Sequence, residues 1–150
     1  MNTIAAELAI RNAIARIANT IDTRRWEELR ALFADEVTID YTSLFGGEVQ
    51  RQRADETVAG WRRLLSPLDA TQHVIGAIEV AIDGDRASAQ CHVRGYHVRH
   101  DAPGGSEWMV AGQWLFDLNA RHGTWQIGSM TLRAFYQTGN QTLLTPASDI

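Results

Sequence analysis

The spacing of apolar residues changes near Pro67 from a helical period to a period of two, and this change limits most strongly what the chain can fold into. Before Pro67, four isoleucines recur at intervals of four, three and four residues: Ile10, Ile14, Ile17 and Ile21. Such intervals place the side chains on one face of a helix, which we expect to begin near Thr3. Beyond Pro67, apolar and polar residues alternate over long segments, as in strands with one buried face.

A second helix is expected directly after the first. Asp22 and Thr23 offer side-chain oxygens that can cap its N-terminus. Its buried stripe would consist of Trp26, Leu29 and Phe33, whose spacing of three and four residues fits one helical face.

The remaining segments are assigned from their period and their turn residues. Residues 37–41 predict a short strand, residues 42–53 a loop, and residues 54–65 a third helix. Four longer strands follow, separated by glycine-containing turns: 71–82, 86–99, 107–118 and 124–137. The polar tail from residue 138 onward is expected to be mobile.

This order predicts one α+β domain over residues 1–150, with three N-terminal helices packed on a curved, cone-shaped antiparallel sheet. The helices would lie on the concave side and leave a pocket between the two layers, where small ligands commonly bind. An open curved sheet in a chain with five tryptophans also exposes apolar surface. We therefore expect a homo-oligomer, either a dimer or a trimer.

The charged residues and the cysteine exclude several kinds of chemistry. All 14 basic residues are arginine, so lysine imines, lysine-containing phosphate loops and serine–lysine pairs are ruled out. The net charge of −4 argues against a nucleic acid or an anionic membrane as partner. Cys91 is the single cysteine, which excludes an internal disulfide and a multi-cysteine metal site. Proton transfer must therefore use carboxylates, histidines, tyrosines or Cys91.

No targeting or membrane-spanning segment is predicted. The first ten residues have no basic stretch before an apolar core. No apolar run approaches the roughly 18 residues of a membrane helix. We therefore expect a cytoplasmic protein.

Three residues are candidates for chemistry in the pocket. Asp22 is either a helix cap or a carboxylate directed between helices and sheet. Tyr41, at the end of the strand 37–41, is either a core residue or a donor to a substrate oxygen. His73, between apolar neighbours in the strand 71–82, is either a structural histidine or a base, since imidazole is the natural base near pH 7.

Three more histidines lie on or just beyond the next strand, where alternation puts His92 and His100 on one face and His97 on the other. The register of the hairpin decides which face is internal. A bulge at Gly95 would be needed to bring His92 and His97 to the same side. His92 and His100 are about 27 Å apart along a strand, so no metal site is expected.

Several polar or aromatic residues have two interpretations. Gln113 stands among apolar neighbours on the strand 107–118, and is either bonded within the sheet or in contact with substrate. Trp108, Trp114 and Trp125 are interpreted as sheet packing, and Cys91 as a core residue.

Two blocks of sequence resemble one known family. The first is Asp-x-x-x-Trp-x-x-Leu-Arg at residues 22–30, followed by Ile-Asp-Tyr at 39–41; the second is Thr-Gln-His-Val-Ile-Gly at 71–76. Together with the order of helices and strands, they resemble the nuclear transport factor 2-like (SnoaL-like) superfamily over about residues 4–137, and within it the scytalone dehydratases. Because that fold serves isomerases, hydrolases, dehydratases and non-enzymatic subunits, it does not by itself define a reaction.

The resemblance to scytalone dehydratases implies an active site containing Asp22, Tyr41 and His73. It also makes Trp26, within the first block, and Gln113, near a site asparagine of the family, candidates for substrate binding.

The chain departs from the family at two further positions. Ile21 stands where the family has a second site tyrosine. The second site histidine of the family aligns with Val98, so His97 takes that role only with a shift of one residue.

The sequence therefore predicts a cofactor-independent lyase that removes water from a small cyclic hydroxy-ketone or a similar hydrophobic substrate. His73 would be the base, and an Asp22–His97 pair, with the imidazole held protonated, would protonate the leaving hydroxyl. Tyr41 would polarise the carbonyl, and Gln113 would orient the ring.

Three alternatives remain open. The chain could be a non-catalytic small subunit of the ring-hydroxylating dioxygenase type, which predicts no large polar pocket. An isomerase on this fold would need an aspartate base on the sheet, and the inward candidates are Asp117 and Glu79, both near strand ends. An epoxide hydrolase would need an Asp–Arg–Asp set, in which Arg94 or Arg99 could serve.

Overall fold

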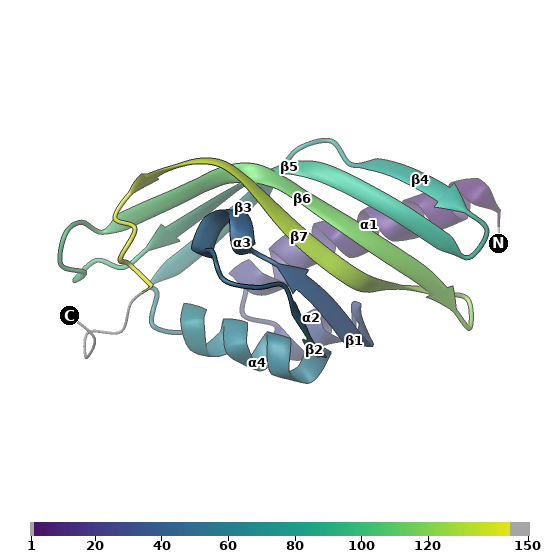
Figure 1. The fold of residues 1–150 in the computed structure, drawn as a ribbon, viewed down its shortest axis with the longest axis horizontal. Helices are drawn as coiled ribbons and strands as arrows, with labels where there is room; N and C mark the ends of the chain where they lie inside the picture. Colours follow the sequence, from purple (N-terminus) through teal and green to yellow (C-terminus); the bar gives the residue numbers. More distant parts are fainter. Residues whose placement is uncertain (1, 145–150) are drawn as a thin grey trace.

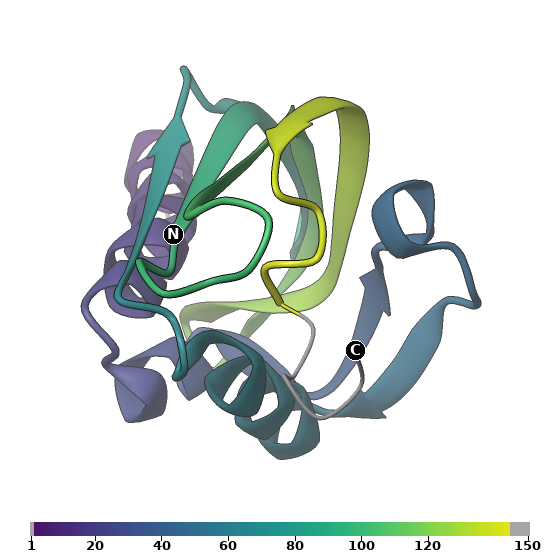
Figure 2. The ribbon, with the colours of Figure 1, turned by 90° about the vertical axis from the view of Figure 1, so that its left-hand side faces the viewer.

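The computed structural model describes residues 2–144 as a curved sheet with helices along its concave side (Figure 1, Figure 2). The helices are α1 (Thr3–Asp22), α2 (Trp26–Arg30), α3 (Thr42–Phe45) and α4 (Ala54–Leu65). The strands are β1 (Phe33–Asp40), β2 (Gln50–Arg53), β3 (Ala70–Ile75), β4 (Glu79–Asp83), β5 (Arg86–Val98), β6 (Glu107–Arg121) and β7 (Thr124–Gly139). The predicted α+β class is confirmed. Within residues 2–144, no helix combines the length and the apolar character needed to cross a membrane.

The first helix, α1, begins where the sequence predicts and continues to Asp22. Its central isoleucines are fully buried, as their spacing predicts, and the Asn2 side chain caps it by accepting from the Ile4 N–H at 3.0 Å. The buried stripe continues to Ile21, so α1 runs on to Asp22. The prediction that Asp22 caps a second helix is therefore wrong.

The second helix is shorter than predicted. Arg24 has a left-handed backbone, with φ of 59°, and turns the chain before α2 begins without a side-chain cap bond. Phe33 is not on this helix but opens β1, where it is buried and pairs with Ile127 of β7. Strand pairing thus overrides the helical spacing of Phe33, and the predicted helical stripe loses its last member.

The sheet is mixed rather than purely antiparallel. Its strand order is β2-β1-β7-β6-β5-β3, with β4 pairing β5, and the sheet is not closed. β1 runs parallel to β7, whereas the other neighbours are antiparallel. The segment 42–53, predicted as a loop, contains α3 and the edge strand β2. The long strands after Pro67 pair antiparallel with one another, as predicted, whereas the N-terminal strand β1 lies beside β7, the last strand, and runs parallel to it.

The predicted strand 71–82 is divided into β3 and β4. Both pair with β5, but residues 76–78 face only residues 91 and 92 of that strand. The extra residue acts as a bulge and shifts the alternation by one position. As a result, odd-numbered residues of β3, His73 among them, face the helices.

The pairing of β5 with β6 continues without a shift from Arg86 to Val98. No bulge exists at Gly95, so His92 and His97 stay on opposite sides of the strand. Odd-numbered residues of β5 and most even-numbered residues of β6 are buried on the concave side. Unbroken alternation therefore decides which side chains of these two long strands can reach a site under the sheet.

The chain after β7 folds back across the open end of the concave side (Figure 2). The amide nitrogen of Asn140 donates to the carbonyl oxygens of Pro103 (2.9 Å) and Gly105 (2.8 Å) in the loop between β5 and β6. Leu143 is only 2% exposed. Residues 138–144, which the sequence predicts to be mobile, are thus placed against the loop between β5 and β6 and the core, and residues 145–150 lie outside the described residues.

Candidate active site

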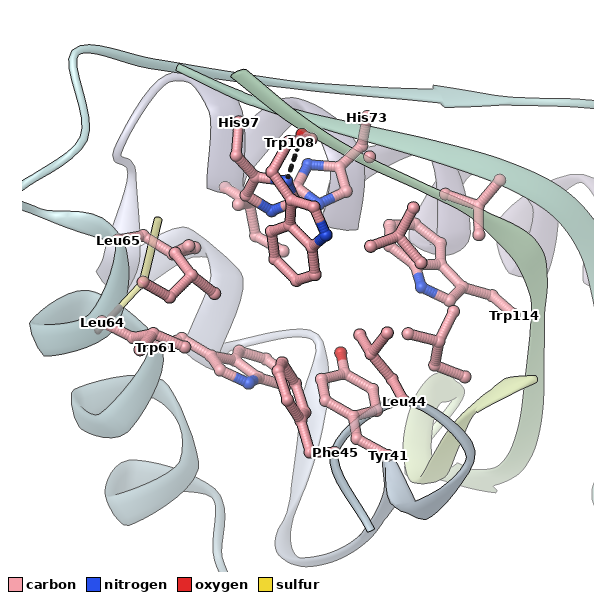
Figure 3. Close-up of a pocket in the computed structure, with 16 residues that line it drawn as sticks. Tyr41, Leu44, Phe45, Trp61, Leu64, Leu65, His73, His97, Trp108 and Trp114 are labelled. Carbon is pink, nitrogen blue, oxygen red and sulfur yellow. Dashed lines mark hydrogen bonds between the residues drawn. The ribbon is translucent and has the colours of Figure 1, made fainter. Parts of the chain in front are cut away.

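A cavity of about 80 Å³ lies between the concave face of the sheet and helices α3 and α4 (Figure 3). A single buried water needs only about 10–15 Å³, so this space can hold a small molecule. Sixteen residues line it: Ile21, Tyr41, Leu44, Phe45, Trp61, Leu64, Leu65, His73, Val93, Gly95, His97, Trp108, Val110, Trp114, Leu132 and Leu144. Only three of them are ionisable, and none is an arginine, so the cavity favours an uncharged, largely apolar occupant.

The carboxylate of Asp22 lies directly behind the imidazole of His73. Oδ1 of Asp22 is 2.7 Å from Nδ1 of His73 and accepts from the hydroxyl of Thr71 at 3.0 Å, while Oδ2 accepts from the backbone N–H of His73 at 2.6 Å. The end of α1 thus meets the inward-facing positions of β3. The side chains of Asp22 and His73 are only 18% and 11% exposed.

These contacts fix the charge of Asp22 and the tautomer of His73. Burial alone would raise the pKa of Asp22, but the hydrogen bonds and positive charge of His73, with the Thr71 hydroxyl, outweigh it and lower that pKa. The carboxylate is therefore ionised at neutral pH and accepts the proton on Nδ1. In the neutral form of His73, this leaves Nε2 with a lone pair on the cavity side of the ring, as a general base requires.

His97 enters the cavity from the neighbouring strand β5. Its ring stands edge-on to His73 with centroids 5.8 Å apart, and its Nδ1 is 3.3 Å from the carbonyl oxygen of Trp108. Burial, followed by the charge of His73, lowers the pKa of His97 to about 4, against weaker opposing effects of the Trp108 and Gly95 carbonyls and Asp22. His97 is therefore neutral at pH 7.

The predicted Asp22–His97 pair is wrong, because Asp22 is bonded to His73 instead. The end of α1 lies against β3, one strand away from His97, and the hydrogen-bond acceptors of Asp22 are taken by Thr71 and His73. Among the three later histidines, His97 is the one that faces the cavity. His92 is exposed on the outer face, and His100 lies beyond β5 with its N–H bonded to Asp69.

Gly95 makes room for the two imidazoles. It pairs with His73 in the β3–β5 register, two positions before His97 on the same face. A Cβ at Gly95 would lie 3.2 Å from Cδ2 and 3.3 Å from Nε2 of His73, and 3.3 Å from Cε1 of His97. The missing side chain is therefore part of the geometry of the site.

Tyr41 faces the histidines from the other side of the cavity (Figure 3). It follows β1 directly and precedes α3, which Ser43 anchors by donating to the carbonyl of Leu132 and accepting from the N–H of Ala134. Its ring stacks on Trp61 with centroids 6.4 Å apart. Burial raises the pKa of Tyr41, so its hydroxyl keeps its proton and can donate a hydrogen bond.

Two predicted substrate contacts do not line the cavity. Gln113 alternates with the inward residues of β6 and lies on the outer face, where it pairs with His92 and Arg133. Trp26 is buried in the core beneath the guanidinium of Arg24, 5.8 Å from its ring. Alternation along β6 explains the position of Gln113, and the turn at Arg24 between α1 and α2 explains that of Trp26.

The cavity walls come largely from residues that the sequence assigned to packing. Trp108 and Trp114 line the cavity, and Trp114 stacks on His73 with centroids 5.5 Å apart. Trp125 and Cys91 are core residues, as predicted, and burial raises the pKa of the Cys91 thiol to about 11. Across residues 2–144, no three His, Cys, Asp or Glu side chains gather closely enough to hold a metal ion.

A model described as a SnoaL-like domain matches residues 2–131, which is most of the chain. The chain belongs to the SnoaL-like family. It is 32% identical to a dehydratase of Pestalotiopsis microspora over 94 residues, which span 60% of this chain and 59% of that protein. It also resembles the Kfla4162 protein of Kribbella flavida, at a TM-score of 0.88 and 27% identity over 97% of this chain and 100% of the other.

More distant solved structures share the fold alone. A candidate scytalone dehydratase of Novosphingobium aromaticivorans is 19% identical, with a TM-score of 0.78 over 92% of this chain and 89% of the other. A hexachlorocyclohexane dehydrochlorinase is 15% identical, with a TM-score of 0.78 over 91% and 90% of the two chains. Because the fold accompanies enzymes of different names, the reaction must be argued from the site.

Proposed function

We propose that this SnoaL-like protein is a cofactor-independent lyase that eliminates water from a small, uncharged cyclic hydroxy-ketone. The observation that carries the proposal is the Asp22–His73 pair, whose geometry leaves Nε2 of a neutral His73 at an apolar cavity as a base. A proton next to a carbonyl is acidic enough for such a base. A positioned general base typically contributes about 10²–10⁴-fold to the rate.

His73 takes the proton, and Asp22 stabilises the imidazolium that results. The two groups then form an ion pair at 2.7 Å between largely buried side chains. Asp22 also prevents rotation of the ring, because it holds both the ring nitrogen and the backbone N–H of the same residue. The base is thus oriented before the substrate binds.

Tyr41 is placed to stabilise the charge that develops on the carbonyl oxygen. Its hydroxyl faces the histidines across the cavity, so a ring lying between them presents its carbonyl to Tyr41 and its acidic C–H to His73 (Figure 3). A donor fixed where charge develops lowers the barrier because it needs no reorganisation during the reaction.

The proton for the leaving hydroxyl comes back from His73 in this mechanism. Neutral His97 has no spare proton to give, because its N–H is directed at the Trp108 carbonyl. The imidazolium of His73 lies on the face of the ring from which the proton was taken. Abstraction and protonation on that same face amount to a syn elimination that regenerates the base.

Other activities fit the site less well. Glu79 and Asp117, the candidate bases of an isomerase, are exposed on the outer face of the sheet. Arg94, a candidate for an epoxide hydrolase, also lies outside, bonded to Tyr136, and Arg99 is not among the lining residues. The Asp22–His73 pair beside an apolar cavity is not needed by a non-catalytic subunit.

The test is turnover of a panel of cyclic hydroxy-ketones by the wild type and by His73→Ala. We expect kcat to fall by about 10²–10⁴-fold in His73→Ala, measured by the ultraviolet absorbance of the conjugated product. His92→Ala, which removes an outer-face histidine of β5, is the control and should keep wild-type turnover. Undiminished turnover in His73→Ala would exclude His73 as the base.

A further inference from the structure

A ligand must reach the cavity from solvent, and the exposure of the lining residues indicates the route. The lining residues that belong to the sheet are buried or half-buried. Among all sixteen lining residues, two are exposed: Phe45 at the end of α3, at 58%, and Leu64 in the last turn of α4, at 39%. The cavity therefore meets solvent between these two helices (Figure 3).

The ring of Phe45 lies across this opening. Its centroid is 6.5 Å from that of Tyr41, on the helix side of the cavity, and 6.3 Å from that of Trp108, on the sheet side. Both separations are near the upper end of the range for aromatic pairs. Because the side chain of Phe45 is more than half exposed and only loosely in contact with both walls, it can move aside without unpacking the core.

The backbone at Phe45 is anchored before this residue and free to turn after it. Ser43, in the first half of α3, is hydrogen-bonded to two backbone groups of β7. Gly46 and Gly47 follow Phe45 directly, with left-handed φ of 68° and 76°, and no described atom lies within 4 Å of the position of a Cβ at either glycine. Glycines in open space accept large changes of φ and ψ, as a hinge requires.

We infer that small molecules enter the cavity between α3 and α4, and that the ring of Phe45 is the gate of this entrance and limits the size of the ring system admitted. Leu64 and Trp61 of α4 form the other side of the entrance, so an uncharged ring passes apolar side chains. The entrance itself does not depend on the reaction, whereas its part in the choice of substrate rests on the proposed function.

The first test measures access to the cavity without any turnover. Three of the five tryptophans line the cavity: Trp61, Trp108 and Trp114. Acrylamide, a small uncharged quencher of tryptophan fluorescence, has to pass the gate to reach them. The Stern–Volmer constant for acrylamide should at least double in Phe45→Ala, which removes the gate. It should fall in Leu64→Phe, which narrows the opening from the side of α4.

Phe135→Ala is the matched control for the loss of an exposed phenyl ring. Phe135 is 52% exposed, much as Phe45 is, but its ring lies beside His92 on the outer face of the sheet. Its removal should leave the Stern–Volmer constant at the wild-type value. The inference is overturned if Phe45→Ala keeps the wild-type constant, or if both alanine variants raise the constant equally.

The second test concerns the size of the substrate. The one-ring 3-hydroxycyclohexanone and the two-ring 4-hydroxy-2-decalone carry the same β-hydroxy-ketone group but differ in width. The ratio of kcat/KM for the two-ring over the one-ring compound should rise about tenfold in Phe45→Ala, and should stay unchanged in Phe135→Ala. An unchanged ratio in Phe45→Ala would overturn the selection by size. If neither ketone is turned over while quenching increases in Phe45→Ala, the proposed function fails and the entrance stands.

Discussion

The two faces of strand β5 carry the same residue type in opposite settings. His97 on the inner face is 8% exposed and packed on Trp108. His92, five residues earlier, is exposed on the outer face, where its ring lies 6.0 Å from that of Phe135. An odd separation along an unbroken strand puts two residues on opposite sides. The parity of the position, rather than the residue type, therefore decides which histidine can take part in chemistry.

Carboxylates show the same contrast. Asp22, at the inner face, accepts hydrogen bonds from Thr71 and twice from His73, which hold it ionised and immobile. Asp117, on the outer face, is exposed and accepts one bond from the hydroxyl of Ser129 at 2.6 Å. The inner carboxylate can direct a neighbouring base, while the outer one is solvated. Equivalent substitutions on the two faces should therefore have unequal effects.

Among the comparisons of inner-face and outer-face substitutions, the largest difference in effect is expected between Asp22→Asn and Asp117→Asn. The first change removes the charge that stabilises protonated His73 and favours its Nδ1–H tautomer, so kcat should fall by about 10²–10⁴-fold. The second should leave kcat within a factor of two of wild type. Steady-state kinetics on the best hydroxy-ketone of the panel measures both. Equal losses in the two variants would break the contrast between the faces.

The second difference between the two faces concerns the contribution of His97 and His92 to stability at low pH. Burial, and then the charge of His73, lowers the pKa of His97 from 6.5 to about 4, so below pH 6.5 the unfolded chain binds a proton that the folded chain excludes. Stability should therefore fall as the pH falls through this window, by about 3 kcal/mol at pH 4. The lowered pKa of Asp22 adds its own loss only below its unfolded value of 3.8.

Urea unfolding at pH 7 and pH 4 measures this effect. His97→Phe should lose less stability than wild type between the two values, by about 3 kcal/mol. His92→Phe should behave as wild type, because that histidine is exposed in the folded chain. An equally steep loss in His97→Phe would show that another group causes the acid sensitivity.

The smallest difference in effect is expected between alanine substitutions of two glycines, each of which lies beside a histidine. In Gly95→Ala the new methyl group would lie 3.2 Å from the ring of His73 and 3.3 Å from that of His97, so both rings must shift by a few tenths of an ångström. Displacement of a base by that amount should lower kcat about tenfold. In Gly76→Ala the nearest atom, Cβ of His92, is 3.5 Å away, an ordinary contact. Turnover by Gly76→Ala should match wild type, and an equal loss in both variants would remove Gly95 from the site.

Local patterns in the sequence predict much of the fold. The helix at 54–65 has the bounds of α4, and the Gly84 turn joins β4 to β5 as expected. The parallel pairing of β1 with β7 has no local signal, because its partners are about 90 residues apart. The extra residue at 76–78 also has no local signal in the sequence, because the alternation of apolar and polar residues does not show whether a bulge is present.

The candidate site divides in the same way. Residue type and the family resemblance select Asp22, Tyr41 and His73; Tyr41 and His73 line the cavity, and Asp22 lies behind His73, bonded to its ring. Their pairing depends on tertiary contacts, so the sequence assigned Asp22 to the wrong histidine. Gln113 was placed in the pocket because the sequence cannot tell which face of β6 is internal.

The turn after β7 gives the cavity a wall that is independent of the sheet. Asn140 fastens this turn to the loop between β5 and β6, and Leu144, four residues later, lines the cavity. Leu144 lies beyond the end of β7, so its position does not depend on how the strands of the sheet pair. The volume and shape offered to a ring can therefore diverge among relatives, or be redesigned, by changes at this one position while Asp22 and His73 keep their alignment.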